Sequence, residues 1–329
     1  VKAQQLDRHR PLCEMWVVEG MSGVRWAVIT KMHHAMVDGI SGSTLSTLLL
    51  DERADVRPDA PRPWSPAAAP SGARLVADAL GERARLPLQL ARDAAGTLRD
   101  PLGGAAHALD VARGLAGYAS LLRGAPEPTV LNGPIGPHRR WQWARARAAE
   151  VKEIREALGG TGNDVVLAAI AGGLRDLLLA TGEPVPATVR TLVPVSVRAR
   201  GERGVFDNQV SAIFAELPVG LDDPVARLDA IHAQLRALKH GHEAEAGQAL
   251  VGLEGYVPER LLAAGGRFAT HRGQHVVNTV TTNVPGPRHT LFLAGRRMLE
   301  SFPYVPIAGH VRIGLAIYSY DGAIGFGIT

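Results

Sequence analysis

The chain has 329 residues, a mean hydropathy close to zero and 46% hydrophobic residues, enough to bury the core of a two-domain globular enzyme. Its one cysteine, Cys13, excludes an internal disulfide and a cysteine-rich zinc site, and the chain lacks the run of about 18 apolar residues that predicts a transmembrane helix. A net charge of +4 suits an anionic partner, but the absence of zinc-finger spacing, a basic heptad region and an aromatic RNA-binding strand argues against nucleic acid.

The two ends of the sequence lead to further expectations. The first residues contain no apolar signal region, so we expect the protein to be cytoplasmic. The chain opens on Val1 rather than methionine and stops inside a strand-like run at residues 327–329, which predicts a fragment of a longer protein.

A pair of strands joined by a turn is predicted first along the chain. Residues 12–19 and 24–32 are rich in β-branched and aromatic side chains, and the Gly-Met-Ser-Gly between them supplies turn chemistry. His33 and His34 follow the second strand directly, and leucines at helical spacing come shortly afterwards. The two histidines are therefore expected at a strand-to-helix junction.

The next part of the chain carries little diagnostic information. Residues 57–72 are dense in proline, alanine and serine, and residues 75–122 follow as helical segments rich in alanine, leucine and arginine, broken at Pro87 and Pro101. These helices either cover a sheet and bridge two domains, or form an amphipathic, arginine-bearing surface that rests on a lipid interface. The pattern leaves both alternatives open.

Proline and glycine at residues 125–137 mark a boundary, which divides the chain into predicted domains at residues 1–124 and 125–329. In the second domain, strands and helices alternate without strict βαβ regularity, which predicts an α/β fold with a mixed sheet flanked by helices. The predicted strands span residues 141–146, 188–197, 209–217, 276–282 and 311–319, and the predicted helices residues 148–158, 163–181 and 224–238.

The segment HHAMVDG at residues 33–39 carries the strongest chemical signal. Moving an acyl group from a thioester to an alcohol needs a base that accepts the hydroxyl proton, and imidazole, with an ordinary pKa of about 6.5, suits that task. Asp38 follows His34 by four residues and can brace the backbone around the imidazole, while Gly39 permits a tight turn. The segment therefore indicates a proton-transfer site.

Two other interpretations of this segment stay open. The histidines can be structural, or His33, His34 and Asp38 can bind a metal, because imidazole and carboxylate are ordinary ligands. Adjacent side chains on a strand point to opposite faces, so both imidazoles would rarely reach one ion. We therefore expect no metal here, and the catalytic and structural interpretations both stay open at this point.

Six segments in the same order give the chain a resemblance to a known family. The segment HHAMVDG matches the HHxxxDG hallmark of the bacterial wax ester synthase/acyl-CoA:diacylglycerol acyltransferase family, and five further segments have counterparts in that family. These are PLCEMW at 11–16, LNGPIG at 131–136, NDVVL at 163–167, PVSVR at 194–198 and NVPGP at 283–287. Cys13 departs from the family pattern, which has tryptophan there, and residues 57–124 have no diagnostic match.

The resemblance implies a fold and a reaction. The fold would be a pair of chloramphenicol acetyltransferase-like α/β subdomains, with mixed sheets flanked by helices and an active-site tunnel between them. The activity would be that of a diacylglycerol O-acyltransferase or wax ester synthase, with His34 as general base, His33 as its supporting neighbour and Asp38 as a structural residue. No cofactor is implied, because acyl-CoA is a co-substrate, and the acceptor is diacylglycerol or a fatty alcohol.

The resemblance also directs attention to residues outside the histidine segment. Asn163 and Asn283 are candidate donors to the oxyanion of the tetrahedral intermediate, but either could equally cap a helix or brace a loop. A structural role is expected for Asp164. Arg198 and Arg288 are candidate contacts for the phosphates of CoA.

The residues are also compatible with one further partner and two alternative functions. A membrane or lipid-droplet surface would be a peripheral partner. A condensation-type acyltransferase with a carrier-bound donor and an inactive lipid-binding relative are the alternative functions.

Overall fold

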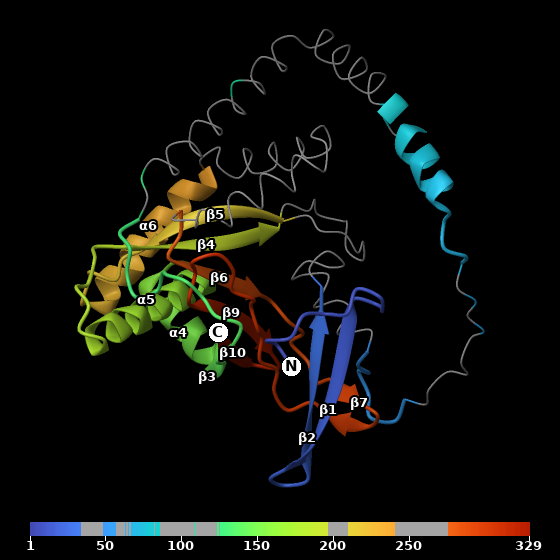
Figure 1. Cartoon of the computed structure of the whole chain (residues 1–329). Helices are drawn as coiled ribbons and strands as arrows, with labels where there is room; N and C mark the ends of the chain where they lie inside the picture. The colour runs from blue at the N-terminus through green and yellow to red at the C-terminus, as the bar shows by residue number, and fades with distance from the viewer. Residues whose placement is uncertain are drawn as a thin grey trace, which may run out of the picture.

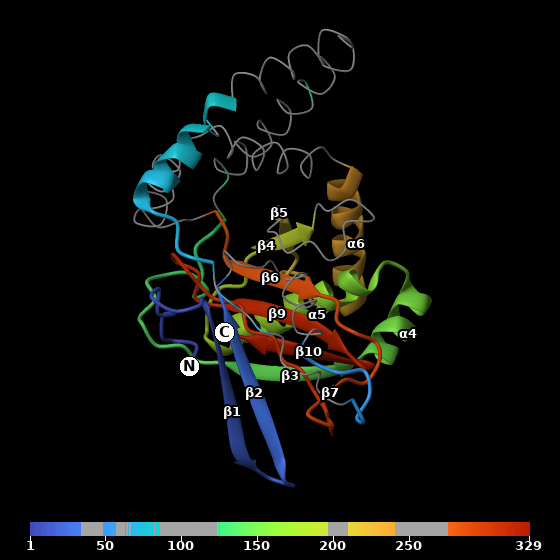
Figure 2. The same cartoon turned by 90° about the vertical axis from the view of Figure 1, so that its right-hand side faces the viewer.

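A computed structural model describes residues 1–33, 49–56, 67–81, 83–85, 126–196, 210–240 and 276–329, with the single residues 63, 65, 109 and 124. The main body of this part is one six-stranded sheet with helices packed on it (Figure 1, Figure 2). In spatial order its strands are β3 (Gln142–Arg147), β10 (Ala323–Ile328), β9 (Gly314–Tyr320), β6 (Thr279–Val284), β4 (Val189–Ser196) and β5 (Val210–Leu217). The helices are α4 (Ala148–Leu158), α5 (Gly162–Ala180) and α6 (Pro224–His240).

The sheet is mixed. Strands β3, β10 and β9 pair antiparallel, as do β4 and β5, whereas β6 runs parallel to both of its neighbours, β9 and β4. This confirms the predicted α/β class with helices flanking a mixed sheet. The described residues contain one sheet of this size, so the pair of related subdomains and the boundary at residue 124 stay predictions.

The core forms where α5 packs on the sheet. Apolar residues recur along α5 at helical spacing, and Leu167, Leu174 and Leu178 are almost completely buried. They belong to one cluster with Val189 of β4 and Ile317 of β9. Burying a side chain of this size contributes about 1.5 to 3 kcal/mol, so the cluster fixes the sheet against the helix.

The N-terminal strands form the predicted hairpin, β1 (Cys13–Met21) and β2 (Arg25–Met32), in which Cys13 lies opposite Met32. The turn works because Gly20 and Gly23 adopt φ angles of 80° and 72°, a region that residues with a Cβ rarely enter. The prediction of a hairpin is therefore confirmed, with strands shifted by one or two residues from the predicted bounds.

A segment around residues 301–303 lies directly on β10. The odd-numbered positions of β10 point away from the core, and the two that follow Ala323 are glycines, Gly325 and Gly327. A Cβ at Gly325 would lie 2.5 Å from the carbonyl oxygen of Ser301, and one at Gly327 would meet that of Pro303. The two glycines therefore let the segment approach the strand closely.

Some elements differ from the prediction. Strands β6 and β9 each begin three residues later than predicted, and the strand-like run at the C-terminus is β10. The strands β7 (Phe292–Leu293) and β8 (Arg296–Arg297) have two residues each, which is too short to give a periodic pattern in the sequence. In the predicted helical segments, the described residues 72–81, 83–85 and 109 are helical and exposed. Within the described ranges, no helix is long and apolar enough to cross a membrane.

Candidate active site

The histidine segment begins where β2 ends. Strand β2 stops at Met32, and His33 follows it with its backbone N–H donating to the carbonyl oxygen of Leu12 at 2.9 Å. The hairpin thus places His33 at the predicted end of the strand. His34, Asp38 and Gly39 lie outside the described residues, so their predicted roles, and the metal alternative, stay predictions.

The two asparagines proposed as oxyanion donors contact each other. Asn163 lies in the first turn of α5 and Asn283 near the end of β6, and the Nδ2 of Asn283 donates to the Oδ1 of Asn163 at 3.0 Å. Among the described residues, the Nδ2 of Asn163 has no hydrogen-bond partner. The contact brings together the NDVVL and NVPGP segments, which are 120 residues apart. Asn283 therefore orients the Asn163 amide, and no described residue accepts a hydrogen bond from the Asn163 Nδ2.

The loop after Asn283 needs its glycine. A Cβ on Gly286 would collide with the ring of Tyr318 and the carbonyl oxygen of Ser319 on β9, and the Gly286 N–H donates to the Ser319 hydroxyl at 3.1 Å. The NVPGP loop is thus held directly against β9, which limits how far Asn283 can move.

Asp164 caps the N-terminus of α5. Its Oδ2 accepts from the backbone N–H of Thr161 at 2.8 Å and lies 2.8 Å from Nδ1 of His232 on α6, while the Asp164 N–H donates to the Thr161 hydroxyl at 3.3 Å. This is a capping box on a carboxylate that is only 1% exposed. Burial raises the pKa of Asp164, but the hydrogen bonds from His232 and Thr161 outweigh it, so the pKa lies below its ordinary value.

His232 is a residue that the sequence analysis missed. It follows the buried Ile231 in α6, where a lone histidine carries no signal, and its partner is 68 residues away. Because Asp164 neighbours Asn163, the contact between His232 and Asp164 also fixes the helix turn that carries Asn163.

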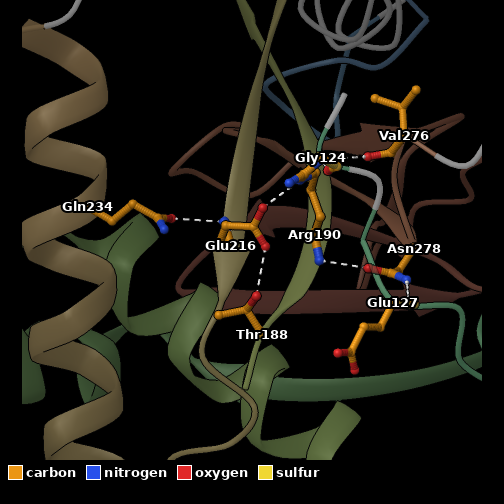
Figure 3. A network of polar contacts seen from close by, with 8 residues as sticks. All are labelled: Gly124, Glu127, Thr188, Arg190, Glu216, Gln234, Val276 and Asn278. Atoms are coloured by element: carbon orange, nitrogen blue, oxygen red, sulfur yellow. Dashed lines mark hydrogen bonds and ion pairs between the residues drawn. The ribbon is translucent and has the colours of Figure 1, made fainter. Parts of the chain in front are cut away.

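A second polar network joins β4 to the segments around it (Figure 3). Arg190 lies opposite Glu216 of β5 and forms an ion pair with it, and its Nη1 donates to the carbonyl oxygens of Gly124 at 2.6 Å and Val276 at 3.4 Å. Its backbone N–H donates to Oδ1 of Asn278 at 2.8 Å. The arginine thereby holds three stretches of chain at one point.

Asn278 extends this network to the LNGPIG segment. Its Nδ2 donates to Oδ1 of Asn132 at 2.8 Å and to the carbonyl oxygen of Glu127 at 2.9 Å (Figure 3 shows the second bond), and Asn132 donates to the carbonyl oxygen of Val277. The LNGPIG segment is therefore held beside the start of β6, the strand whose end carries the NVPGP segment. Arg198 of the PVSVR segment lies outside the described residues, and no metal-binding cluster of three ligands occurs in the described part of the chain.

Family models account for most of the chain. Residues 1–166 match the wax ester synthase/diacylglycerol acyltransferase catalytic domain, and residues 206–329 match the WS/DGAT C-terminal domain. The chain belongs to the wax ester synthase/diacylglycerol acyltransferase family. The resemblance carried by the six segments is thus confirmed.

One similar WS/DGAT relative is the Mycobacterium tuberculosis (strain H37Rv) protein named "Probable diacyglycerol O-acyltransferase tgs1", which is 34% identical over 333 residues. That alignment covers 99% of this chain and 68% of the relative. The enzyme class implied by the resemblance, diacylglycerol O-acyltransferase or wax ester synthase, is that of the family, and the name of this relative gives the first of the two.

Solved structures show the WS/DGAT fold. The wax ester synthase/diacylglycerol acyltransferase from Marinobacter aquaeolei VT8 matches with a TM-score of 0.62 at 23% identity, over 99% of this chain and 66% of that one. The cyclization-docking bidomain of EpoB from Sorangium cellulosum matches with a TM-score of 0.51 at 13% identity, over 97% of this chain and 57% of that one. This chain thus spans about two thirds or less of the length of these proteins, and its fold is similar to that of the EpoB bidomain.

Proposed function

We propose that the protein transfers a long-chain acyl group from acyl-CoA to the hydroxyl of diacylglycerol or a fatty alcohol. The observation that carries this proposal is the HHAMVDG segment, which starts at the end of β2 in a chain of the WS/DGAT family. Acyl-CoA is the donor, and the product is a triacylglycerol or a wax ester. The proposed location of the protein is the cytoplasm or the surface of a membrane or lipid droplet.

The proposed chemistry uses His34 as the base. Its neutral imidazole takes the proton from the acceptor hydroxyl as that oxygen forms a bond to the thioester carbonyl carbon. The tetrahedral intermediate then breaks its carbon–sulfur bond, and the imidazolium returns the proton to the departing CoA thiolate. His33 supports the base and Asp38 holds the loop around it, with Gly39 at the turn. No covalent enzyme intermediate and no cofactor is needed.

The developing oxyanion needs a hydrogen-bond donor about 3 Å away. Asn163 is the proposed donor, because its Oδ1 is occupied by Asn283 and its Nδ2 has no partner among the described residues. Asn283 then acts through Asn163 by orienting the amide. Arg198 is the proposed contact for CoA phosphate, because guanidinium pairs well with phosphate oxygens.

A panel of donors and acceptors tests the proposed reaction. Palmitoyl-CoA is offered with diacylglycerol, hexadecanol or a sterol, and the release of free CoA thiol is measured together with the lipid product. We expect thiol release that depends on diacylglycerol or the alcohol. Activity only with an acyl group on a carrier protein would replace the proposal by the condensation-type alternative. Lipid binding without any acceptor-dependent thiol release would identify an inactive lipid-binding relative.

A further inference from the structure

An unusually basic and aromatic stretch forms one edge of the sheet. Residues 138–147 read HRRWQWARAR and contain four arginines, two tryptophans and no acidic residue. Most of the stretch is β3, which lies at the end of the strand order and pairs only with β10 among the described strands (Figure 2). The proposed acyl transfer uses none of these residues.

The aromatic rings of this edge are exposed and held in place. Trp141 and Trp143 are 38% and 46% exposed, which is high for side chains of this size. The ring of Trp143 lies 5.0 Å from that of Phe302, and Trp141 meets Phe302 edge-on at 6.3 Å. The indole N–H of Trp141 also donates to the carbonyl oxygen of Pro303 at 3.2 Å. The segment that lies on β10 therefore fixes the rings at the surface.

Positive charge surrounds these rings. The guanidinium of Arg145 lies 4.3 Å from the centre of the Trp143 ring and forms an ion pair with Glu300, and Arg147 is paired with Glu150. Arg139 and Arg140 precede the tryptophans and have no acidic partner among the described residues. The four arginines outnumber the two glutamates, so the edge keeps a net positive charge.

We propose that this β3 edge patch, made of Arg139, Arg140, Trp141, Trp143 and Phe302, docks the protein on an anionic lipid bilayer. Tryptophan has an apolar body and a polar N–H, and it therefore partitions to the boundary between headgroups and acyl chains. Arginines beside it pair with anionic headgroups. This inference extends the proposed function, whose acceptors are lipids, by naming the surface that meets the lipid.

A nucleic acid is a poorer occupant of the β3 edge patch. Single-stranded nucleic acids stack their bases on open aromatic faces. Trp143 already stacks with Arg145 and contacts Phe302, so less of its ring is open to a base. A second copy of the chain would have to bring its own arginines against those of the first, which like charges disfavour.

Vesicle flotation with the full chain tests the proposal. One set of vesicles contains only phosphatidylcholine, and the other contains about 30 mol% phosphatidylglycerol, a fraction at which an anionic surface attracts basic segments. We expect binding to the anionic vesicles that weakens as salt rises. Replacing Trp141 and Trp143 together by alanine should weaken binding at least about ten-fold, because each indole loses apolar contact with the bilayer. The double variant Arg139→Gln/Arg140→Gln should weaken it about 25-fold, at roughly five-fold per arginine.

A matched control removes the same charge elsewhere. Lys152→Gln/Arg155→Gln on α4 changes two exposed basic residues that are not part of the β3 edge patch and should leave vesicle binding unchanged. Circular dichroism shows whether each variant is folded. A tryptophan variant that unfolds is replaced by Trp141→Phe/Trp143→Phe, which keeps the apolar rings but loses the indole N–H groups and should bind several-fold less.

Several results would overturn the inference. These are equal binding to neutral and anionic vesicles, no binding at all, or an equal loss in the α4 control. Loss of oligonucleotide binding or of self-association in the patch variants, with vesicle binding intact, would assign the surface to those partners instead. The outcome is separable from the proposed reaction, because thiol release is measured in detergent. An active enzyme that ignores vesicles contradicts only this inference, and an inactive protein that binds them contradicts only the proposed function.

Discussion

Replacing Asp164 by alanine removes both hydrogen bonds that the carboxylate accepts, from the Thr161 N–H and from Nδ1 of His232. Loss of a helix cap costs about 1 kcal/mol, and loss of a buried hydrogen bond to a charged group costs about 1.5 to 3 kcal/mol. Because the His232 side chain is partly exposed, the hydrogen bond from His232 contributes near the low end of that range. We therefore expect the free energy of unfolding to fall by about 2 to 4 kcal/mol.

Urea unfolding followed by far-ultraviolet circular dichroism at neutral pH measures this loss. Asp176→Ala is the matched control, because Asp176 is an exposed aspartate of the same helix, and it should change the free energy of unfolding by less than about 0.5 kcal/mol. Equal effects of the two variants would contradict the capping role of Asp164.

The pH dependence provides an independent check on the same residue. The pKa of Asp164 is lowered in the folded state, so the charged carboxylate stabilises the protein above its ordinary pKa of about 3.9. That contribution is lost as pH falls through the folded-state pKa. The stability gap between wild type and Asp164→Asn should therefore narrow below about pH 4. A gap that stays constant down to acid unfolding would refute the reasoning.

Three further predictions concern the site, the sheet and the network at β4. Asn163→Ala should lower the acyl-transfer rate at saturating substrate about a hundred-fold, and Asn283→Ala about ten-fold. The double variant should be no slower than Asn163→Ala, because Asn283 acts through Asn163. Additive losses in steady-state kinetics would contradict this. Gly325→Ala should lower the melting temperature, because the new Cβ meets the Ser301 carbonyl oxygen. Gly173→Ala, which has open space around it in α5, should raise the melting temperature slightly. An unchanged melting temperature for Gly325→Ala would show that the segment at residues 301–303 can move away from β10. Arg190→Met leaves Glu216 without its cation and should destabilise the fold by about 3 kcal/mol in urea unfolding, and an effect below about 0.5 kcal/mol would make the network dispensable.

Local pattern was enough to predict most elements of the sheet. Runs rich in β-branched and aromatic residues predict β1 and β2, alternating Val and Thr predict β4, and leucines at helical spacing predict α5. Each of these signals is repeated several times within one element. The two-residue strands β7 and β8 depend on contacts made elsewhere in the chain and leave no periodic signal.

The contacts around the site could not be predicted in the same way. Arg190 and Glu216 face each other because two strands pair in one register, and His232 reaches Asp164 only after α5 and α6 have packed. Neither relation is visible in sequence spacing. The asparagines Asn163 and Asn283 were singled out by their family segments, but only the structure shows that they contact each other.

The most direct test of the account is acceptor-dependent release of CoA thiol by the His34→Ala protein. The wild-type chain and His138→Ala, which changes an exposed histidine outside the HHAMVDG sequence, are measured beside it at equal concentration. If His34 is the base, its loss should slow acyl transfer by about a hundred-fold or more in a protein that stays folded, while His138→Ala keeps the wild-type rate. A folded His34→Ala protein that turns over at close to the wild-type rate would contradict the proposed mechanism.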